Sequence, residues 1–251
     1  MSDELKTAIE AAKAGAKVAL KYFDQEIKID IKEDNTPVTI ADKETEQEVK
    51  KVILGKFASA TFLGEESSDQ AHGKDFWTID PIDGTANYIR GLPFWAVELA
   101  YVQNGECLVG VSYCPVLDEL FYAERGKGAF KNGKRTFVSK VRRPQDAFFI
   151  HGTIKYFKVR MKGFLALCET VFRQRGFGDF YGYHQVACGR ADIMMDAKNH
   201  AWDMAALNVI IEEAGGKHTN FDGSRWNLDD PTSIATNGFI HEDVLKILNE
   251  K

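Results

Sequence analysis

The sequence predicts a layered sandwich of helices and sheets, of the α/β or α+β class. Three observations support this: an amphipathic helical pattern at the start, strand-like runs with closely spaced turns over residues 94–137, and a strong helical pattern over residues 203–214. The 251 residues are enough to bury a large core. No linker-like stretch interrupts them. We therefore expect one domain over residues 1–251, with two halves of about 1–142 and 143–251 that share one cleft.

The N-terminal part of the sequence predicts two helices and two short strands. Helices are expected over residues 3–23 and 42–54, and strands over residues 27–31 and 38–40 with a turn at 33–37 between them. The first strand is expected because isoleucines alternate with polar residues over 27–31, and the second because residues 38–40 form a short apolar run. The first helix has its apolar residues on one stripe: Leu5, Ala8, Ile9, Ala12, Ala16 and Leu20.

The rest of the sequence predicts strands that end in acids and then a mostly antiparallel sheet. Residues 60–64 and 76–79 have the composition of buried strands, and each runs into a cluster of acidic residues. Residues 94–137 contain several strand-like runs separated by glycine-containing turns. The elements expected beyond them are helices at 161–173, 185–188, 203–214 and 241–249 and a strand at 233–236.

The composition argues against several classes of protein. The net charge is −5, from 32 basic and 37 acidic residues, and no long Lys/Arg stripe is present, so nucleic acid is not an expected partner. No apolar run approaches the roughly 20 residues that cross a bilayer, and the N-terminus mixes charge with alanine, unlike a signal peptide. The four cysteines have no metal-ligand spacing, which favours reduced thiols. We therefore expect a cytoplasmic protein with no membrane partner.

Acidic residues gather in three segments that follow a predicted strand or begin a predicted helix: 64–67, 80–85 and 202–203. In the second segment, Pro81 has a fixed φ and a rigid turn there would aim the carboxylates of Asp80 and Asp83 at one point. Gly84 lets the backbone approach a ligand, and a helix that begins at Thr85 would offer free N–H groups to an anion. A hard divalent cation between the acids and a phosphate would remove their repulsion, and oxygen ligands suit Mg²⁺.

Each of these acids also has an ordinary structural interpretation. Asp203 is a plausible N-cap for the helix that follows it, and Glu65 with Glu66 could form a solvated turn. Taken singly, such interpretations account for most Asp and Glu residues. They are weakened here because acids recur at strand ends and one segment is framed by Pro, Gly and Thr.

The motifs GEES (64–67), DPIDGT (80–85) and WDMAALNVIIEEAGG (202–216), in this order, resemble those of the inositol monophosphatase family. The similarity covers nearly the whole chain, including VTIAD (38–42) and GAFKNG (128–133). The resemblance implies an α-β-α-β-α sandwich of the inositol monophosphatase and fructose-1,6-bisphosphatase type. It also implies a phosphatase that uses two or three Mg²⁺ ions per active site and metal-activated water rather than a protein nucleophile.

Residue by residue, the resemblance implies a role for each position in these motifs. The metal ligands would be Glu65, Asp80, Asp83 and Asp203 through their side chains and Ile82 through its carbonyl oxygen. The catalytic residues would be Glu66, which would position water or a weaker third metal, and Thr85, which would orient the attacking water with the help of Asp42. The backbone N–H groups of Gly84 and Thr85 would bind the phosphate. Every one of these positions holds the residue that the family's pattern requires.

The resemblance implies a small phosphate monoester as the substrate, and the sequence leaves its identity open. Asp196 lies seven residues before Asp203, where the inositol phosphatases have an acid that contacts substrate hydroxyls. Asp179 lies in the stretch 176–192, which looks closer to the histidinol-phosphatase branch, whereas the stretch 80–94 looks closer to the inositol branch. We rank inositol monophosphate or a similar polyol phosphate first, with histidinol phosphate as the alternative. A bisphosphate nucleotide, or a non-catalytic metal- or phosphate-binding role, ranks lower.

Two further expectations follow from the resemblance. Family members are commonly dimers, and the aromatic-rich run at residues 91–95 is more apolar than the core face of one strand needs, so we expect a homodimer. Inhibition by Li⁺ is also expected, because Li⁺ is close to Mg²⁺ in size but has half its charge. Other phosphatase mechanisms find no support, since the sequence has no Cys-x5-Arg loop and no Ser-His-Asp arrangement.

Overall fold

The structure is a computed structural model that describes three stretches of the chain: residues 1–31, 37–67 and 74–250. Most of the turn expected at 33–37 lies outside the described residues. Strands β1 (Ile29–Ile31) and β2 (Pro37–Thr39) pair antiparallel in a small sheet of their own. Ile29 and Ile31 are 43% and 63% exposed, so the alternation of isoleucines marks a strand but not a core face.

Two helices near the N-terminus pack against each other, α1 (Asp3–Tyr22) and α2 (Ile40–Leu54). The buried face of α1 consists mainly of alanines, which allow a close approach. At Gly15 the approach requires glycine, because a β-carbon there would lie 2.7 Å from Cγ2 of Val49. Both helices were predicted, and α2 begins two residues earlier than expected.

The first large sheet has seven strands in the order β3-β4-β5-β6-β7-β8-β9. β3 and β4 are parallel, and every later pair is antiparallel, as the closely spaced turns predict. The strands are β3 (Phe62–Gly64), β4 (Asp75–Asp83), β5 (Ala96–Gln103), β6 (Glu106–Cys114), β7 (Glu119–Glu124), β8 (Gly128–Lys131) and β9 (Lys134–Arg135). The short helix α3 (Thr85–Tyr88) follows β4.

The second large sheet has five short strands in the order β11-β10-β12-β14-β13. They are β10 (Phe148–His151), β11 (Arg173–Arg175), β12 (Ile193–Asp196), β13 (Lys217–Thr219) and β14 (Ser233–Thr236). Only β14 was predicted. The helices of this part are α4 (Met161–Thr170), α5 (Asp179–Ala187), α6 (Ala201–Glu213) and α7 (His241–Asn249). The prediction for α4 was too long, since Arg173 belongs to β11, and α5 begins six residues before the expected 185–188.

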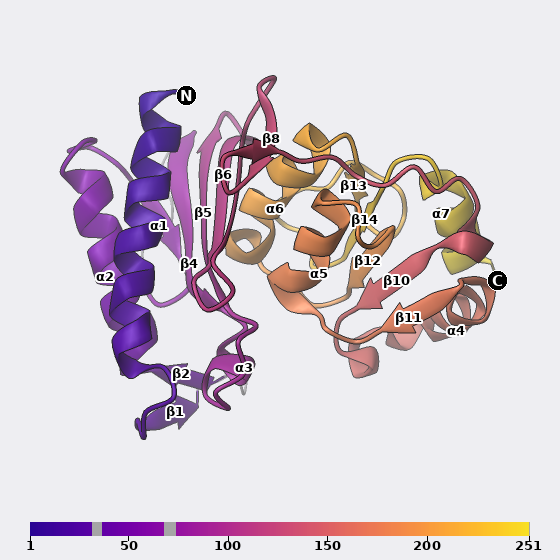
Figure 1. Ribbon diagram of the computed structural model, residues 1–251, viewed down its shortest axis with the longest axis horizontal. Coiled ribbons are helices and arrows are strands. Elements are labelled where there is room, and N and C mark those ends of the chain that lie inside the picture. Colours follow the sequence, from indigo (N-terminus) through magenta and orange to yellow (C-terminus); the bar gives the residue numbers. More distant parts are fainter. Residues whose placement is uncertain (32–36, 68–73, 251) are drawn as a thin grey trace.

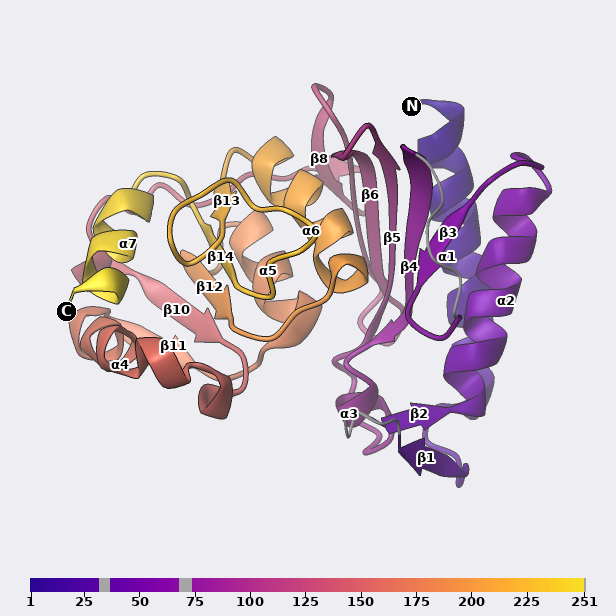
Figure 2. The ribbon, with the colours of Figure 1, turned by 180° about the vertical axis from the view of Figure 1, so that it is seen from behind.

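The elements form five layers (Figure 1). α1 and α2 cover one face of the seven-stranded sheet, and α5 and α6 lie between that sheet and the five-stranded sheet. α4 and α7 pack together on the outer face of the five-stranded sheet, and the view from behind shows the same order (Figure 2). The predicted α-β-α-β-α sandwich is therefore confirmed.

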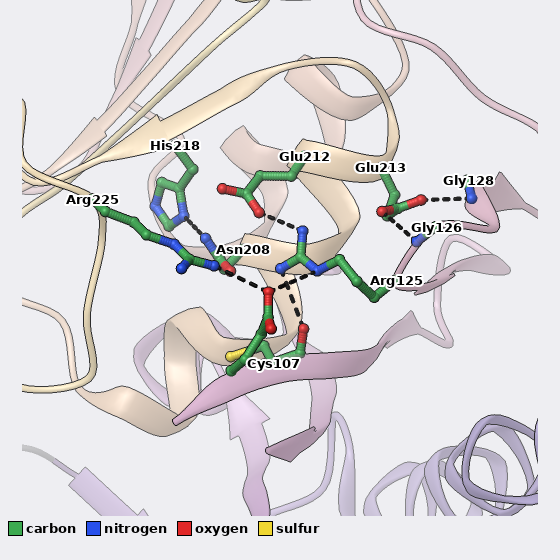
Figure 3. A network of polar contacts seen from close by, with 10 residues as sticks. Cys107, Arg125, Gly126, Gly128, Asn208, Glu212, Glu213, His218 and Arg225 are labelled. Atoms are coloured by element: carbon green, nitrogen blue, oxygen red, sulfur yellow. Dashed lines mark hydrogen bonds and ion pairs between the residues drawn. The ribbon is translucent and has the colours of Figure 1, made fainter. Parts of the chain in front are cut away.

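Helix α6 is the centre of the sandwich and is buried on nearly all sides. It packs so closely on β6 that a β-carbon at Gly110 would lie 2.4 Å from the carbonyl oxygen of Ala206. A polar network fixes its C-terminal end to the seven-stranded sheet (Figure 3). There Arg125 forms an ion pair with Glu212 at 2.5 Å and donates to the carbonyl oxygen of Cys107. The position of α6 matters because its other end contributes to the candidate site.

Candidate active site

A cavity of about 520 Å³ opens where the two large sheets and their helices meet. Most of the residues singled out in the sequence as site residues line it: Glu65, Asp80, Ile82, Asp83, Gly84, Thr85, Asp179 and Asp203. They come from the ends of β3 and β4, from α3, and from the N-terminal turns of α5 and α6. The structure thus brings the three acidic segments together at one place.

A bulge in β4 aims two of the carboxylates. Asp80 lies opposite Glu98 of β5 and Asp83 lies opposite Ala96, so two residues of β4 face a single residue of β5. The sequence predicted a turn at Pro81, and the structure shows this bulge inside a continuous strand instead. Proline is tolerated at a bulge because no ladder hydrogen bond is lost there. The carboxylate of Asp80 accepts the N–H of Ile82 at 2.9 Å.

The chain turns sharply after β4 and begins α3. Gly84 has φ of +87°, and a β-carbon there would lie 2.7 Å from the carbonyl oxygen of Phe94, so both conformation and space require glycine. The Thr85 hydroxyl lies 3.0 Å from the carbonyl oxygen of Ile82 and 3.4 Å from Oδ1 of Asp42. The predicted contact between Asp42 and Thr85 is therefore present, although Asp42 itself does not line the cavity.

Asp42 is held in place by the start of α2. Its Oδ2 accepts both the N–H and the hydroxyl of Thr39 at 2.7 Å, as the third residue of a helix does in a capping box. Burial raises the pKa of Asp42, and the two bonds from Thr39 lower it. This arrangement leaves Oδ1 directed toward Thr85.

The turn after β3 places Glu65 at the cavity and Glu66 beside it. A residue that the sequence did not single out, Glu46 of α2, supports this turn. Its carboxylate accepts the N–H of Glu66 at 2.9 Å and pairs with Lys50 at 2.9 Å. A β-carbon at Gly64 would lie 2.7 Å from the same carboxylate, so the turn depends on glycine at this position. Glu66 does not line the cavity.

Asp203 reaches the cavity from the first turn of α6. It is the third residue of the helix and its carboxylate accepts the N–H of His200 at 2.8 Å. A second interpretation of Asp203 from the sequence is the N-cap of this helix, but the N-cap of α6 is His200. The pKa of Asp203 is raised to about 8, mainly by burial, which outweighs the lowering effect of the bond from His200 and is reinforced by the charges of Glu65, Asp179 and Asp196.

Asp179 begins α5 and faces the same cavity. It has a left-handed backbone with φ of +48°, which Asp tolerates better than most residues. The side-chain amide of Asn87 donates to its Oδ2 at 3.1 Å, and the next residue, Phe180, donates its N–H to Oδ2 of Asp83 at 2.9 Å. Burial raises the pKa of Asp179 to about 6, against the lowering effect of the hydrogen bond from Asn87.

Asp196, at the end of β12, is buried close to the cavity without lining it. Burial and the charge of Asp179 raise the pKa of Asp196 to about 7. A β-carbon at Gly152 would lie 2.1 Å from its carboxylate, so the side chain is tightly enclosed. The two predicted substrate-binding acids are thus electrostatically coupled, but only Asp179 faces the cavity directly.

Like charges dominate the electrostatics of the cavity. Burial raises the pKa of Asp80 and of Asp83 well above the usual range, and neighbouring acids raise both further. For Asp80 these neighbours are Glu65, Asp83 and Asp203. A cluster of buried carboxylates of this kind is costly unless protons or cations neutralise it. The donor set, carboxylates with the carbonyl oxygen of Ile82, fits a hard divalent cation such as Mg²⁺.

In the part of the chain that the structure describes, no three His, Cys, Asp or Glu side chains form a ready-made set of metal ligands. Four residues that carry no role in the sequence prediction also line the cavity: Tyr156, Lys198, His200 and Trp202. Trp202 stacks on His200 with ring centroids 4.7 Å apart. A resemblance to metal-site motifs does not reveal a role for these residues, because none of them is a carboxylate of those motifs.

The raised pKa values predict that the metal-free protein loses stability as the pH rises. A folded-state pKa above the unfolded value of 3.8 means that the folded protein retains a proton which the unfolded chain releases, so this stability is lost as the pH rises toward the folded pKa. Between pH 7 and 8.5 we expect the titration of Asp203 to lower the free energy of unfolding by about 1 kcal/mol. The melting temperature in EDTA should fall by roughly 2–4 °C.

Two controls make this measurement specific. Excess Mg²⁺ should remove the dependence on pH, because a cation then replaces the protons. Asp203→Asn should flatten the profile in EDTA, whereas Asp146→Asn, at an exposed acid paired with Arg143, should not. Equal melting temperatures at pH 7 and 8.5 in EDTA would show that the acids are not coupled as described.

Comparison with known proteins agrees with the fold and the site. A sequence profile of the inositol monophosphatase family matches residues 1–251. A histidinol-phosphatase of Mycobacterium tuberculosis is 35% identical over 258 residues, which cover 98% of each chain. A fructose-1,6-bisphosphatase/inositol-1-monophosphatase of Thermotoga maritima is 36% identical over 214 residues, which cover 85% of this chain and 82% of that one. Among solved structures, an IMPase of Thermotoga maritima has a TM-score of 0.92 at 32% identity and covers 99% of this chain and 97% of that one.

These similarities extend over the whole sandwich and are not confined to one motif. Within the described ranges, no helix is long and apolar enough to span a membrane. The family profile covers the entire chain, and the five-layered fold agrees with it. The chain therefore belongs to the inositol monophosphatase family of phosphoric monoester hydrolases.

Proposed function

We propose that the protein is a Mg²⁺-dependent phosphatase that releases phosphate from a small amino-alcohol or polyol ester. The observation that carries this proposal is the convergence of Glu65, Asp80, Asp83 and Asp203 on one cavity beside Thr85. Buried acids at this density need cations, and a phosphate ester needs the same cations to approach them. The homologous phosphatases support the reaction class.

The ligands of Mg²⁺ would be those four carboxylates together with the carbonyl oxygen of Ile82. When bound, two such ions would supply charge neutralisation for the phosphate and a lowered pKa for water. The protein contributes orientation: once the carbonyl of Ile82 binds a cation, the Thr85 hydroxyl would donate to Oδ1 of Asp42, which lies 3.4 Å away. The hydroxyl oxygen would then be free to accept a hydrogen bond from the attacking water. Glu66, one residue beyond Glu65, would position water or a further cation. Gly84 and Thr85 would donate N–H groups to the phosphate.

The leaving group is the part of the substrate that Asp179 would contact. The sequence alone ranked a polyol such as inositol first, and the geometry favours reversing this order. Asp179 adds a half-buried carboxylate to the cavity beyond those needed for Mg²⁺, and its charge acts on the buried Asp196. An ammonium group would neutralise such a pair, whereas uncharged hydroxyls would not. Together with the similarity to histidinol-phosphatases, this favours histidinol phosphate, with inositol phosphate as the second candidate.

The test is phosphate release from a panel of esters in the presence of Mg²⁺: histidinol phosphate, inositol 1-phosphate, fructose 1,6-bisphosphate and glycerol 2-phosphate. We expect the highest kcat/KM with histidinol phosphate, by about tenfold or more over glycerol 2-phosphate, since an added ion pair in a buried pocket contributes about this much. A higher value with inositol 1-phosphate would restore the order from the sequence. No release from any ester would refute the phosphatase proposal.

Three further proposals concern the setting of the enzyme. We propose a cytoplasmic location, because the cysteines are free and no site requires an oxidising compartment in the described ranges. We propose a homodimer and inhibition by Li⁺ because of the family resemblance. The run at residues 91–95 supports the dimer only in part, since Leu92 is exposed but Trp95 is fully buried in the core.

A further inference from the structure

Three buried polar residues form a chain behind the carboxylate cluster. The hydroxyl of Ser112, in β6, lies 2.5 Å from Oε1 of Glu98, in β5, and 2.5 Å from Nε2 of His184, in α5. All three side chains are completely buried. The chain connects the seven-stranded sheet to the helix whose first residue, Asp179, faces the cavity. None of the three belongs to the motifs that carry the metal site.

The hydrogens of this chain can be counted. Its two hydrogen bonds need two hydrogens, and the Ser112 hydroxyl supplies one. The other comes from a protonated Glu98 or from an N–H at Nε2 of His184. The Ser112 hydroxyl donates to Oε1 of Glu98, so the second hydrogen is the one on Nε2 of His184, which donates to the Ser112 oxygen. Burial lowers the pKa of His184 well below its usual range, which favours this neutral imidazole, and it raises the pKa of Glu98 well above its usual range.

The hydrogen bonds from Glu98 to His184 do not continue beyond these two residues. Oε2 of Glu98 and Nδ1 of His184 have no hydrogen-bond partner within the described ranges. A path for protons would need a further acceptor at each end, so the arrangement suits a fixed attachment rather than a relay. Aromatic packing completes the attachment, because His184 stacks on Phe121 at 4.0 Å and meets the edge of Phe180 at 4.9 Å.

The attached helix has an N-terminus under constraint. His184 lies four residues after Phe180, so both residues occupy the same face of α5. Phe180 donates its N–H to Asp83, and Asp179 adopts the left-handed backbone described above. A residue in that conformation keeps it only where the surroundings determine it. The attachment at His184, about 7.5 Å along the helix from Asp179, supplies such a determinant.

We propose that Glu98, Ser112 and His184 are positioning residues that set the location of α5, and thereby place Asp179 against the ammonium group of the substrate. This proposal rests on the proposed function, which identifies the substrate group near Asp179 as an ammonium. It assigns substrate discrimination to residues that make no contact with the cavity. It also gives a role to a glutamate that lies between apolar side chains, since Ala96 and Ala100 on the same face of β5 belong to the hydrophobic core.

The test compares full-length Ser112→Ala with the wild type in two Mg²⁺-dependent reactions. Histidinol phosphate carries an ammonium group, and glycerol 2-phosphate does not. We expect kcat/KM for histidinol phosphate to fall roughly tenfold, mainly through KM, while the value for glycerol 2-phosphate stays within about threefold. Glu98→Gln keeps an acceptor and a donor toward Ser112, so it should retain the discrimination of the wild type. In an Asp179→Asn background, Ser112→Ala should produce no further loss of discrimination.

The matched control is Thr219→Val, in β13 of the five-stranded sheet. It removes another buried hydroxyl that contacts a buried histidine, His241 of α7. It should lower stability without changing the ratio of the two substrates. Equal losses for both substrates in Ser112→Ala, or the same change of ratio in Thr219→Val, would overturn the proposal. If the wild type itself shows no preference for the ammonium substrate, the proposed substrate is wrong. Hydrogen exchange then tests the positioning role by itself. Ser112→Ala should then speed exchange in residues 178–187 at least about tenfold more than in α7, and unchanged exchange there would overturn the positioning role.

Discussion

Removal of divalent cations is expected to abolish phosphate release, with a loss of at least about 1,000-fold, and added Mg²⁺ should restore it. The reason is electrostatic. Without cations, the acids that line the cavity repel a phosphate dianion, and Lys198 is the only lysine among the described residues that line it. Bound cations contribute several kcal/mol of charge stabilisation to reactions of this kind, which corresponds to such a factor.

The measurement is steady-state hydrolysis of the best ester after dialysis against EDTA, followed by titration with MgCl2. EDTA that is saturated with Mg²⁺ serves as the control for effects of the chelator itself. A second readout does not depend on turnover: the melting temperature at pH 8.5 should rise with Mg²⁺ concentration, because a ligand that binds only the folded state stabilises it. Full turnover in excess EDTA would exclude a metal-assisted reaction.

The sequence predicted the candidate site better than it predicted the second sheet. The acidic segments could be placed because each follows a recognisable strand or begins a helix, and because glycine and proline frame them. By contrast, β10 and β12 are four-residue strands buried on nearly every side chain, FFIH and IMMD. Such short apolar runs have no alternation, so periodicity alone does not distinguish them from pieces of a helix.

Other misses share one cause, which is that a distant residue decides the local structure. The bulge of β4 exists because β5 pairs on both sides of Pro81, and the sequence around Pro81 fits a turn equally well. The start of α5 depends on Asp83, which accepts the N–H of Phe180 across 97 residues of sequence. The buried chain from Glu98 to His184 has no signature in the sequence, because its members come from three separate elements. The division into two halves near residue 142 stays a prediction.

Replacement of Asp83 by asparagine should reduce kcat/KM by at least about 100-fold while leaving the fold intact. Asparagine has nearly the same shape and still offers an oxygen to the N–H of Phe180, so α5 retains this attachment. What disappears is a negative charge and a strong ligand for Mg²⁺, and the loss of one principal electrostatic stabiliser costs about this factor. The metal-free variant should be at least as stable as the wild type, because burial and the charges of Asp179 and Asp203 already raise the pKa of Asp83.

The matched control is Asp75→Asn, the same substitution at the opposite end of the same strand. Asp75 is exposed at the start of β4 and lies outside the cavity, so activity should remain within about twofold of the wild type. A titration with Mg²⁺ separates two forms of the loss. If Asp83 only binds the cation, high Mg²⁺ should recover most of kcat, whereas a deficit that persists at saturation shows that its charge also stabilises the transition state. We expect the loss of kcat to persist at saturating Mg²⁺. Asp83 lies where β4, α3 and α5 meet, and asparagine removes one negative charge from this junction at every concentration of Mg²⁺. An Asp83→Asn enzyme with wild-type activity at low Mg²⁺ would refute its role as a metal ligand.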